Sequence, residues 1–180
     1  MMNKFDTLFL ILLFSVGCGT SGPLFAQEKL QVAVFDLKLD LEIANARGPD
    51  DQLLAKKASD RLRAELSKNP PYLLIDQTWI DQALQSVRAQ GLQCTTDACA
   101  WEIGKTLKAD RIVTGKIMKI STLISLVTAR MIDVKTGKVL KEETLELKGT
   151  FSDIVPNAMA ALSRRIIEEP HEALTGNPTY

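Results

Sequence analysis

The spacing of apolar residues along the chain predicts alternating strands and helices. Over residues 30–39 the chain reads Leu-Gln-Val-Ala-Val-Phe-Asp-Leu-Lys-Leu, and Val32 to Phe35 is apolar at every position. A strand that is covered by helices on both faces has this continuous apolar pattern. We therefore predict a central strand here, followed by a loop over 43–51 that contains a Gly-Pro pair.

The next segment has the period of a helix. Over residues 54–66 an apolar side chain recurs at every fourth position, at Leu54, Ala58, Leu62 and Leu66. This spacing predicts an amphipathic helix whose outward face carries the cations Lys56, Lys57, Arg61 and Arg63. Asn69-Pro70-Pro71 ends the helix, and a short buried strand over 72–76 follows.

Two further helices are predicted before the next strands. Thr78 is expected to cap the first and Gly91 to end it, with apolar residues on one side at Ile80, Leu84 and Val87. Thr95 or Thr96 caps the other, whose inward residues are Ala100, Ile103 and Leu107. Gly104 inside this helix costs about 1 kcal/mol relative to alanine. A close approach to a neighbouring element would explain why glycine is accepted there.

The remainder is rich in β-forming residues and ends in a helix. Residues 111–120, 123–134 and 139–147 read as strands, and Lys135-Thr136-Gly137-Lys138 between the last two is a hairpin turn. A final stripe comprises Phe151, Val155, Met159, Leu162 and Ile166, and Pro156 is tolerated near the helix start.

The predicted order is therefore β-α-β-α-α-β-β-β-α. The first two strands, joined through a helix, are expected to be parallel with a right-handed crossover. The last three form an antiparallel meander. We predict an α/β (α+β) fold with a mixed five-stranded sheet and helices packed on it. About 150 residues remain after the leader, of which one domain spans 28–169 and a loose polar tail spans 170–180.

The first 26 residues have the pattern of a secretory signal. Lys4 precedes an apolar run over 8–16, and small residues lead to Ala26. The run is shorter than the roughly twenty apolar residues that span a bilayer. Cleavage after Ala26 would release a soluble chain into the periplasm. Alternatively, Ser15-Val16-Gly17-Cys18 resembles a lipobox, and Cys18 would then be lipidated and anchor a lipoprotein that faces the periplasm.

Composition narrows the classes of partner. Lysine plus arginine and aspartate plus glutamate both total 22, and 6% of residues are aromatic. The balanced charge gives no basic excess to attract nucleic acid, and aromatic residues are too few for a stacking platform. We expect no nucleic-acid partner and a membrane contact only through an anchor at Cys18.

Cys94 and Cys99 are the pair that remains if Cys18 leaves with the leader or carries lipid. In an oxidising compartment two nearby cysteines indicate a local disulfide, which would contribute about 2 kcal/mol. A redox role is the alternative, because Cys99 falls in a first helical turn where a thiolate is stabilised. Zinc has less support, since His171 is the only histidine. We expect no metal and no cofactor.

Other chemical motifs are weak. Val113-Thr114-Gly115-Lys116 lacks the frame of a phosphate loop. Asp36, Asp76 and Asp110 lie near strand ends, where α/β sites collect, although acids there more often cap or bind loops. Trp79 and Trp101 read as packing residues. With one histidine in the tail and no nucleophile motif, we predict that the protein is not an enzyme.

The order of the motifs resembles a family of bacterial envelope domains. The residues that carry the resemblance are 32–36, 59–66, 72–77, 94–99, 102–104, 109–115 and 132–137. Together they are similar to domains related to the curli-secretion lipoprotein and to the amino-terminal domain of the translocation protein TolB, of which many members have unknown function. The resemblance implies a non-enzymatic scaffold that binds protein partners or assembles in the envelope. The long insertion that builds a membrane-spanning barrel in curli-type members has no counterpart here.

Three functions follow as hypotheses. The first is a periplasmic interaction module for an envelope protein or for self-assembly, with Lys56, Lys57, Arg61 and Arg63 as the candidate binding face. The second is a small-ligand-binding protein with its site near Asp36 and Asp76. The third is a thiol oxidoreductase that uses Cys94 and Cys99.

Overall fold

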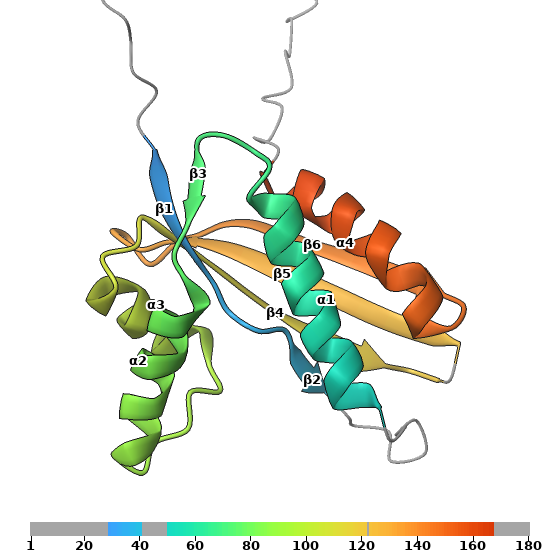
Figure 1. Cartoon of the computed structure of the whole chain (residues 1–180), viewed down its shortest axis with the longest axis horizontal. Coiled ribbons are helices and arrows are strands. Elements are labelled where there is room, and N and C mark those ends of the chain that lie inside the picture. The colour runs from blue at the N-terminus through green and yellow to red at the C-terminus, as the bar shows by residue number, and fades with distance from the viewer. Residues whose placement is uncertain (1–28, 41–49, 122, 168–180) are drawn as a thin grey trace, which may run out of the picture.

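The computed structural model describes residues 29–40, 50–121 and 123–167. Within them a six-stranded sheet runs in the order β3-β1-β4-β5-β6, with the short β2 paired beside β4, and four helices pack around it (Figure 1). The elements are β1 (Leu30–Val34), β2 (Lys38–Asp40), α1 (Asp51–Leu66), β3 (Tyr72–Leu74), α2 (Gln77–Ala89), α3 (Asp97–Thr106), β4 (Arg111–Lys119), β5 (Ile124–Asp133), β6 (Val139–Lys148) and α4 (Phe151–Ile167).

The strand directions agree with the predicted fold class. β1 lies between β3 and β4 and is parallel to both. β4, β5 and β6 form an antiparallel meander. A mixed α/β fold is thereby confirmed, with β1 as the predicted central strand. Strand β3 is only half-buried, however, because it lies at the edge of the sheet.

The predicted count of five strands is wrong, because the first predicted strand is split in two. Val34 pairs with Val113, whereas the next paired residue, Lys38, lies opposite Lys116. From Val34 to Lys38 the chain advances by four residues, while β4 advances by three. The β1–β2 segment therefore contains one extra residue, which interrupts the ladder as in a β-bulge. The backbone amide of Leu37 is instead satisfied by the Ser59 hydroxyl of α1, 2.9 Å away.

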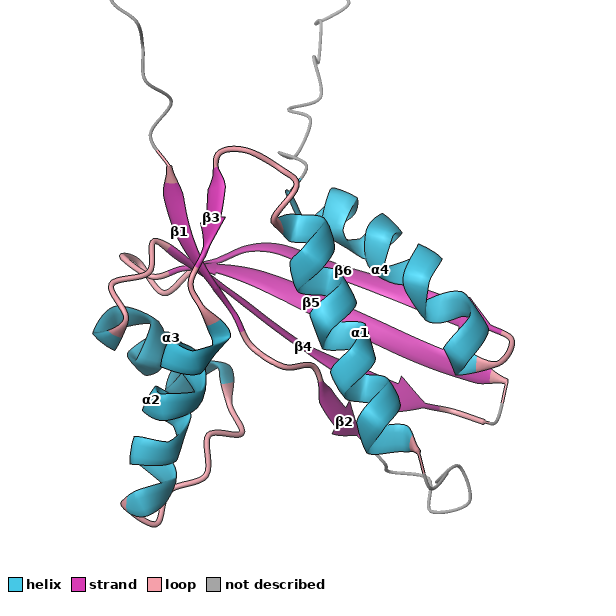
Figure 2. Ribbon diagram, in the orientation of Figure 1, coloured by secondary structure: helices cyan, strands magenta, loops and turns pink. Residues whose placement is uncertain are grey.

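Each face of the sheet has its own apolar core. Helices α1 and α4 lie side by side across one face (Figure 2) and bury side chains that include Leu62, Leu66, Val127, Met159 and Leu162. Helices α2 and α3 gather at the β1 end of the other face, over a smaller core that includes Phe35, Ile80, Ile103, Ile112 and Ile132. The second face is therefore covered over only part of its length.

Local signals explain the helix ends. The carboxylate of Asp76 accepts a 2.7 Å hydrogen bond from the Thr78 amide, so Asp76 caps α2 and the predicted Thr78 cap is wrong. Thr96 caps α3 as one of the two predicted alternatives. The predicted close approach at Gly104 is confirmed, since a Cβ there would lie 2.6 Å from Ile112 Cγ2. Gly137 has φ +71 in the hairpin turn.

The predicted leader (1–26) with Cys18, most of the loop over 43–51, and the tail (170–180) with His171 lie outside the described residues.

Candidate functional site

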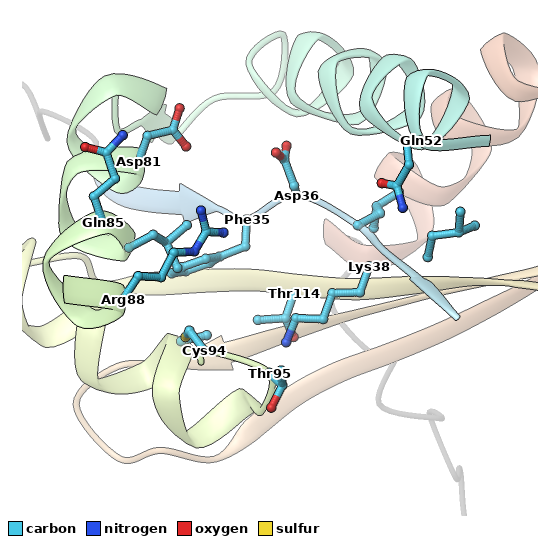
Figure 3. A pocket seen from close by; sticks show the side chains of 15 residues that line it. Phe35, Asp36, Lys38, Gln52, Asp81, Gln85, Arg88, Cys94, Thr95 and Thr114 are labelled. Atoms are coloured by element: carbon cyan, nitrogen blue, oxygen red, sulfur yellow. The ribbon is translucent and has the colours of Figure 1, made fainter. Parts of the chain in front are cut away.

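A cleft of about 560 Å³ lies where the β1–β2 link, α2 and the Cys94–Cys99 loop meet over β4 (Figure 3). Its walls combine apolar and charged side chains: Phe35, Asp36, Leu37, Lys38, Leu39, Gln52, Asp81, Leu84, Gln85, Arg88, Cys94, Thr95, Ala100, Thr114 and Gly115. We call this hollow the cleft. It lies at the boundary between the covered and uncovered parts of the second sheet face.

The interruption between β1 and β2 shapes one wall of the cleft. Asp36 projects from the link toward α1 (Figure 3), where it pairs with Arg63 and lies 3.6 Å from Lys56. Gly115 lets the link pass closely, because a Cβ on it would meet Leu37 Cδ2 at 2.6 Å and the Thr128 carbonyl oxygen at 2.4 Å. The sequence correctly placed Asp36 at a strand end, but its carboxylate is held by two cations.

Two cations face the cleft without an ion pair among the described residues. Arg88 reaches in from α2, and Lys38 extends toward Thr95 and Thr114 (Figure 3). Burial lowers the pKa of the Lys38 ammonium, and the nearby charge of Asp97 offsets this only in part. Neither cation was singled out by sequence reasoning, because an isolated lysine or arginine on an exposed segment carries no spacing signal.

A charged network continues from the cleft onto the sheet. Asp97, in the first turn of α3, accepts hydrogen bonds of 2.9 Å from Thr114 Oγ1 and from Arg130 Nη1. Arg130 also donates to Glu142 of β6 at 2.9 Å. Hydrogen bonds to Glu142 and then to Asp97 raise the pKa of Arg130 above its usual range. The network fixes the start of α3 on three strands and borders a second hollow of about 350 Å³.

Cys94 and Cys99 form a disulfide, with Cα atoms 5.3 Å apart. The bridge closes the loop that enters α3, and Cys99 lies in the first helical turn as its position predicted. Cys94 and Thr95 from this loop line the cleft. The disulfide therefore constrains one wall of the cleft, in agreement with a structural staple.

The predicted cationic face of α1 is largely paired. Lys56 bonds to Asp60 at 2.9 Å, and Arg61 bonds to Glu65 at 2.7 Å. The prediction that Arg63 points outward is wrong: its side chain is 14% exposed and donates to the Val34 carbonyl oxygen at 3.2 Å. Only Lys57 of the four cations is exposed without an ion pair among the described residues.

The remaining sequence candidates have structural contacts. Asp76 caps α2 and does not line the cleft. Asp110 accepts a 2.7 Å hydrogen bond from the backbone amide of Gln31. Trp101 donates to the Val134 carbonyl oxygen at 2.8 Å, as expected of a packing residue. Trp79 is 62% exposed, so the packing interpretation is wrong for it.

Residues 29–40, 50–121 and 123–167 contain neither a metal-binding cluster nor a membrane-spanning helix. No cluster of three or more histidine, cysteine or acidic residues suited to a metal ion occurs in them. No helix among these residues has the length and apolar character to cross a membrane.

Solved structures of a lipoprotein and of a LpoB domain share this fold. Lipoprotein GNA1162 from Neisseria meningitidis matches with a TM-score of 0.54 at 14% identity, over 81% of this chain and 99% of that one. The C-terminal domain of LpoB from Salmonella enterica matches with a TM-score of 0.53 at 16% identity, over 66% of this chain and 82% of that one. At such identities the likeness concerns the fold.

Comparison with curated proteins gave no match. A family model with the description "Protein of unknown function (DUF2380)" matches residues 30–167. The match begins at the first residue of β1 and ends at the last residue of α4, so it includes every element of the fold. The predicted membership of a family of unknown function is thereby confirmed, and the chain belongs to the family described as "Protein of unknown function (DUF2380)".

Proposed function

We propose that this protein is an envelope protein whose domain is a non-catalytic module that binds a protein partner. The predicted signal sequence and the shared fold with LpoB and lipoprotein GNA1162 support an envelope location. Contacts of the carboxylates in and near the cleft support a non-catalytic role: Asp36 and Asp97 are engaged by cations, and Asp81 accepts a 2.9 Å hydrogen bond from the side-chain amide of Gln77.

The observation that carries this proposal is the uncovered part of the sheet beside the cleft. Strand register places three rows on the face opposite the α1–α4 core, and we call them the open face: Arg130 with Glu142; Lys116, Thr128 and Thr144; Met118, Leu126 and Glu146. Among the described residues, only the start of α3 touches these rows, where Asp97 bonds to Arg130 in the first of them. An antiparallel sheet tolerates a solvated face, yet Met118 and Leu126 place half-buried apolar side chains on it.

The open face suits a protein partner better than a small molecule. A small-molecule pocket encloses most of its ligand, whereas the cleft opens directly onto a broad surface of strands. Protein interfaces combine an apolar centre with a polar rim, and here Lys116 and Glu146 lie beside Met118 and Leu126. The unpaired cations Lys38 and Arg88 would steer association, while apolar contact supplies most of the affinity.

Co-purification from envelope extracts tests the proposal. Thr144 is exposed near the middle of β6, so Thr144→Arg should block the open face without entering the core. Gln82→Arg on the exposed side of α2 is the control, since it adds the same charge and the same final side chain away from the open face. We expect one envelope protein to co-purify with the wild-type chain and the control and to be lost with Thr144→Arg. Equal recovery with both variants would contradict a partner site on the open face.

Fractionation tests the location and the form of the mature chain. We propose either a soluble periplasmic protein or a lipoprotein anchored at Cys18. A Cys18→Ala change that moves the protein from membrane to soluble fractions supports the anchor, and an unchanged soluble fraction supports cleavage after Ala26. Full-length protein in the cytosol would contradict export.

A small-ligand function remains the second candidate because of two observations. Lys38 and Arg88 face the cleft unpaired, opposite the apolar side chains of Phe35 and Leu84. This arrangement suits a small amphipathic anion. Thermal unfolding with a panel of such anions would support it if one raises the midpoint of the wild type and not that of Arg88→Gln.

A further inference from the structure

The chain is neutral as a whole, yet its charges are unevenly distributed. A depression of about 450 Å³ lies where β1 and β4 begin and β5 ends. Four cations line it, and we call them the basic end: Lys105, Lys108, Arg111 and Lys135. Because they come from the end of α3, the following loop, β4 and the hairpin turn, composition and spacing do not reveal the cluster.

The two carboxylates in the same depression are engaged by other donors. The Asp110 carboxylate accepts a 2.7 Å hydrogen bond from the backbone amide of Gln31. The Asp133 carboxylate accepts two hydrogen bonds of 2.7 Å, one from the backbone amide and one from the hydroxyl of Thr136. No ion pair joins either carboxylate to the basic end within the described residues. The charge of Asp133 still attracts Arg111 and Lys135, but four cations face two carboxylates in this depression, so an excess of positive charge remains.

The cations themselves are available to a ligand. Lys108 and Lys135 are exposed and have no ion pair among the described residues. The buried Nε of Arg111 lacks a hydrogen-bond partner in the structure. Lys105 is partly compensated, since it bonds to Glu102 at 2.7 Å and lies 4.0 Å from the centre of the Trp101 ring.

Structural roles explain these residues only in part, since Arg111 and Lys135 attract one carboxylate, that of Asp133. Lys105 lies in the last turn of α3, where a cation interacts favourably with the helix dipole. Arg111 lies in a strand and Lys135 in a turn, outside the reach of that effect. Lys108 has φ 54, a conformation that glycine or asparagine usually adopts after a helix. Backbone conformation therefore does not favour lysine at this position.

The position at which the chain enters the domain indicates which ligand binds the basic end. Leu30, the first residue of β1, also lines the depression, so the predicted leader side of the chain joins the domain here. Cys18 precedes Leu30 by twelve residues, which span at most about 40 Å. We propose that the basic end docks on the anionic phosphate groups of a lipid bilayer surface. This inference is independent of the partner site on the open face.

Binding to vesicles tests the proposal without any acyl anchor. The protein is purified from the envelope with Cys18→Ser and sedimented with vesicles of phosphatidylglycerol and phosphatidylcholine, or of phosphatidylcholine alone. Lys108→Gln with Lys135→Gln removes two charges from the basic end. Lys57→Gln with Lys148→Gln removes two exposed lysines elsewhere, on α1 and at the last residue of β6, and serves as the control.

We expect binding to the anionic vesicles only, weakened by added salt. Each cation at an anionic surface contributes about fivefold, so the pair at the basic end should weaken binding about 25-fold. The control pair should change it less than about twofold, because the surface field decays within a Debye length. Equal losses for both pairs would overturn the assignment. Titration with inorganic phosphate distinguishes the other source: saturable binding of phosphate without vesicle binding would also overturn it.

Discussion

Replacing Gly104 by alanine should destabilise this domain, although the same change stabilises an ordinary helix. The new Cβ would lie 2.6 Å from Ile112 Cγ2 and 3.2 Å from Val134 Cγ2. Both contacts are methyl groups of β-branched side chains, whose χ1 angles are stiff. Ile112 is 0% exposed and Val134 is 5% exposed, so neither can move into solvent.

The magnitude follows from two opposing effects. Overpacking a well-packed core costs about 1–3 kcal/mol, and a separation of 2.6 Å places this site in the upper part of that range. Replacing glycine by alanine inside a helix recovers about 1 kcal/mol. We therefore expect the free energy of unfolding to fall by about 1–2 kcal/mol.

Urea unfolding followed by circular dichroism measures this change. Ala64→Gly at an exposed position of α1 is the control, because it reports the helix-propensity effect without a packing change. It should lower the free energy of unfolding by about 1 kcal/mol. If Gly104→Ala instead raises stability by a similar amount, α3 does not approach the sheet as closely as described.

Three other changes test the described contacts. Removing the disulfide with Cys94→Ala and Cys99→Ala should lower the free energy of unfolding by about 2 kcal/mol, and a reductant should have the same effect on the wild type; free thiols in fresh protein would contradict the staple. The hydrogen bond from the Thr136 hydroxyl lowers the pKa of Asp133, so this stabilisation is present above the unfolded pKa of about 3.9 and is lost as pH falls through the lower folded pKa. Thr136→Val should make urea midpoints fall less steeply below about pH 4, and an unchanged slope would refute the linkage. Arg63→Met should cost about 1–3 kcal/mol, because its guanidinium bonds to a carbonyl and to carboxylates; a loss under about 0.5 kcal/mol would mean a solvated surface residue.

The sequence predicted those elements whose residues repeat with a regular period. Leu62 and Leu66 fall at every fourth position and lie in the core under α1, as expected. Glycine is unfavourable inside a helix, so its presence at position 104 correctly indicated that α3 packs closely against a neighbouring element. The meander was predictable because Gly137 stands in a turn between two β-rich segments.

The errors arise where tertiary contacts override local pattern. The split of the first strand depends on Leu37 bonding to Ser59 of α1, which no local signal reveals. Arg63 has the spacing of an outward residue, yet Asp36 and the Val34 carbonyl draw it toward the sheet. The cleft could not be predicted for the same reason, since its lining comes from segments that only the fold brings together.

The central claim is that a protein partner binds the open face of the sheet, and site-specific photocrosslinking in cells tests it most directly. A photoreactive amino acid replaces Thr128 on the open face or, as the control, Gln82 on the exposed side of α2. We predict a discrete adduct with one envelope protein from position 128, its loss when Thr144→Arg is added, and no such adduct from position 82. The same adduct from both positions, or an adduct at 128 that persists with Thr144→Arg, would contradict the claim.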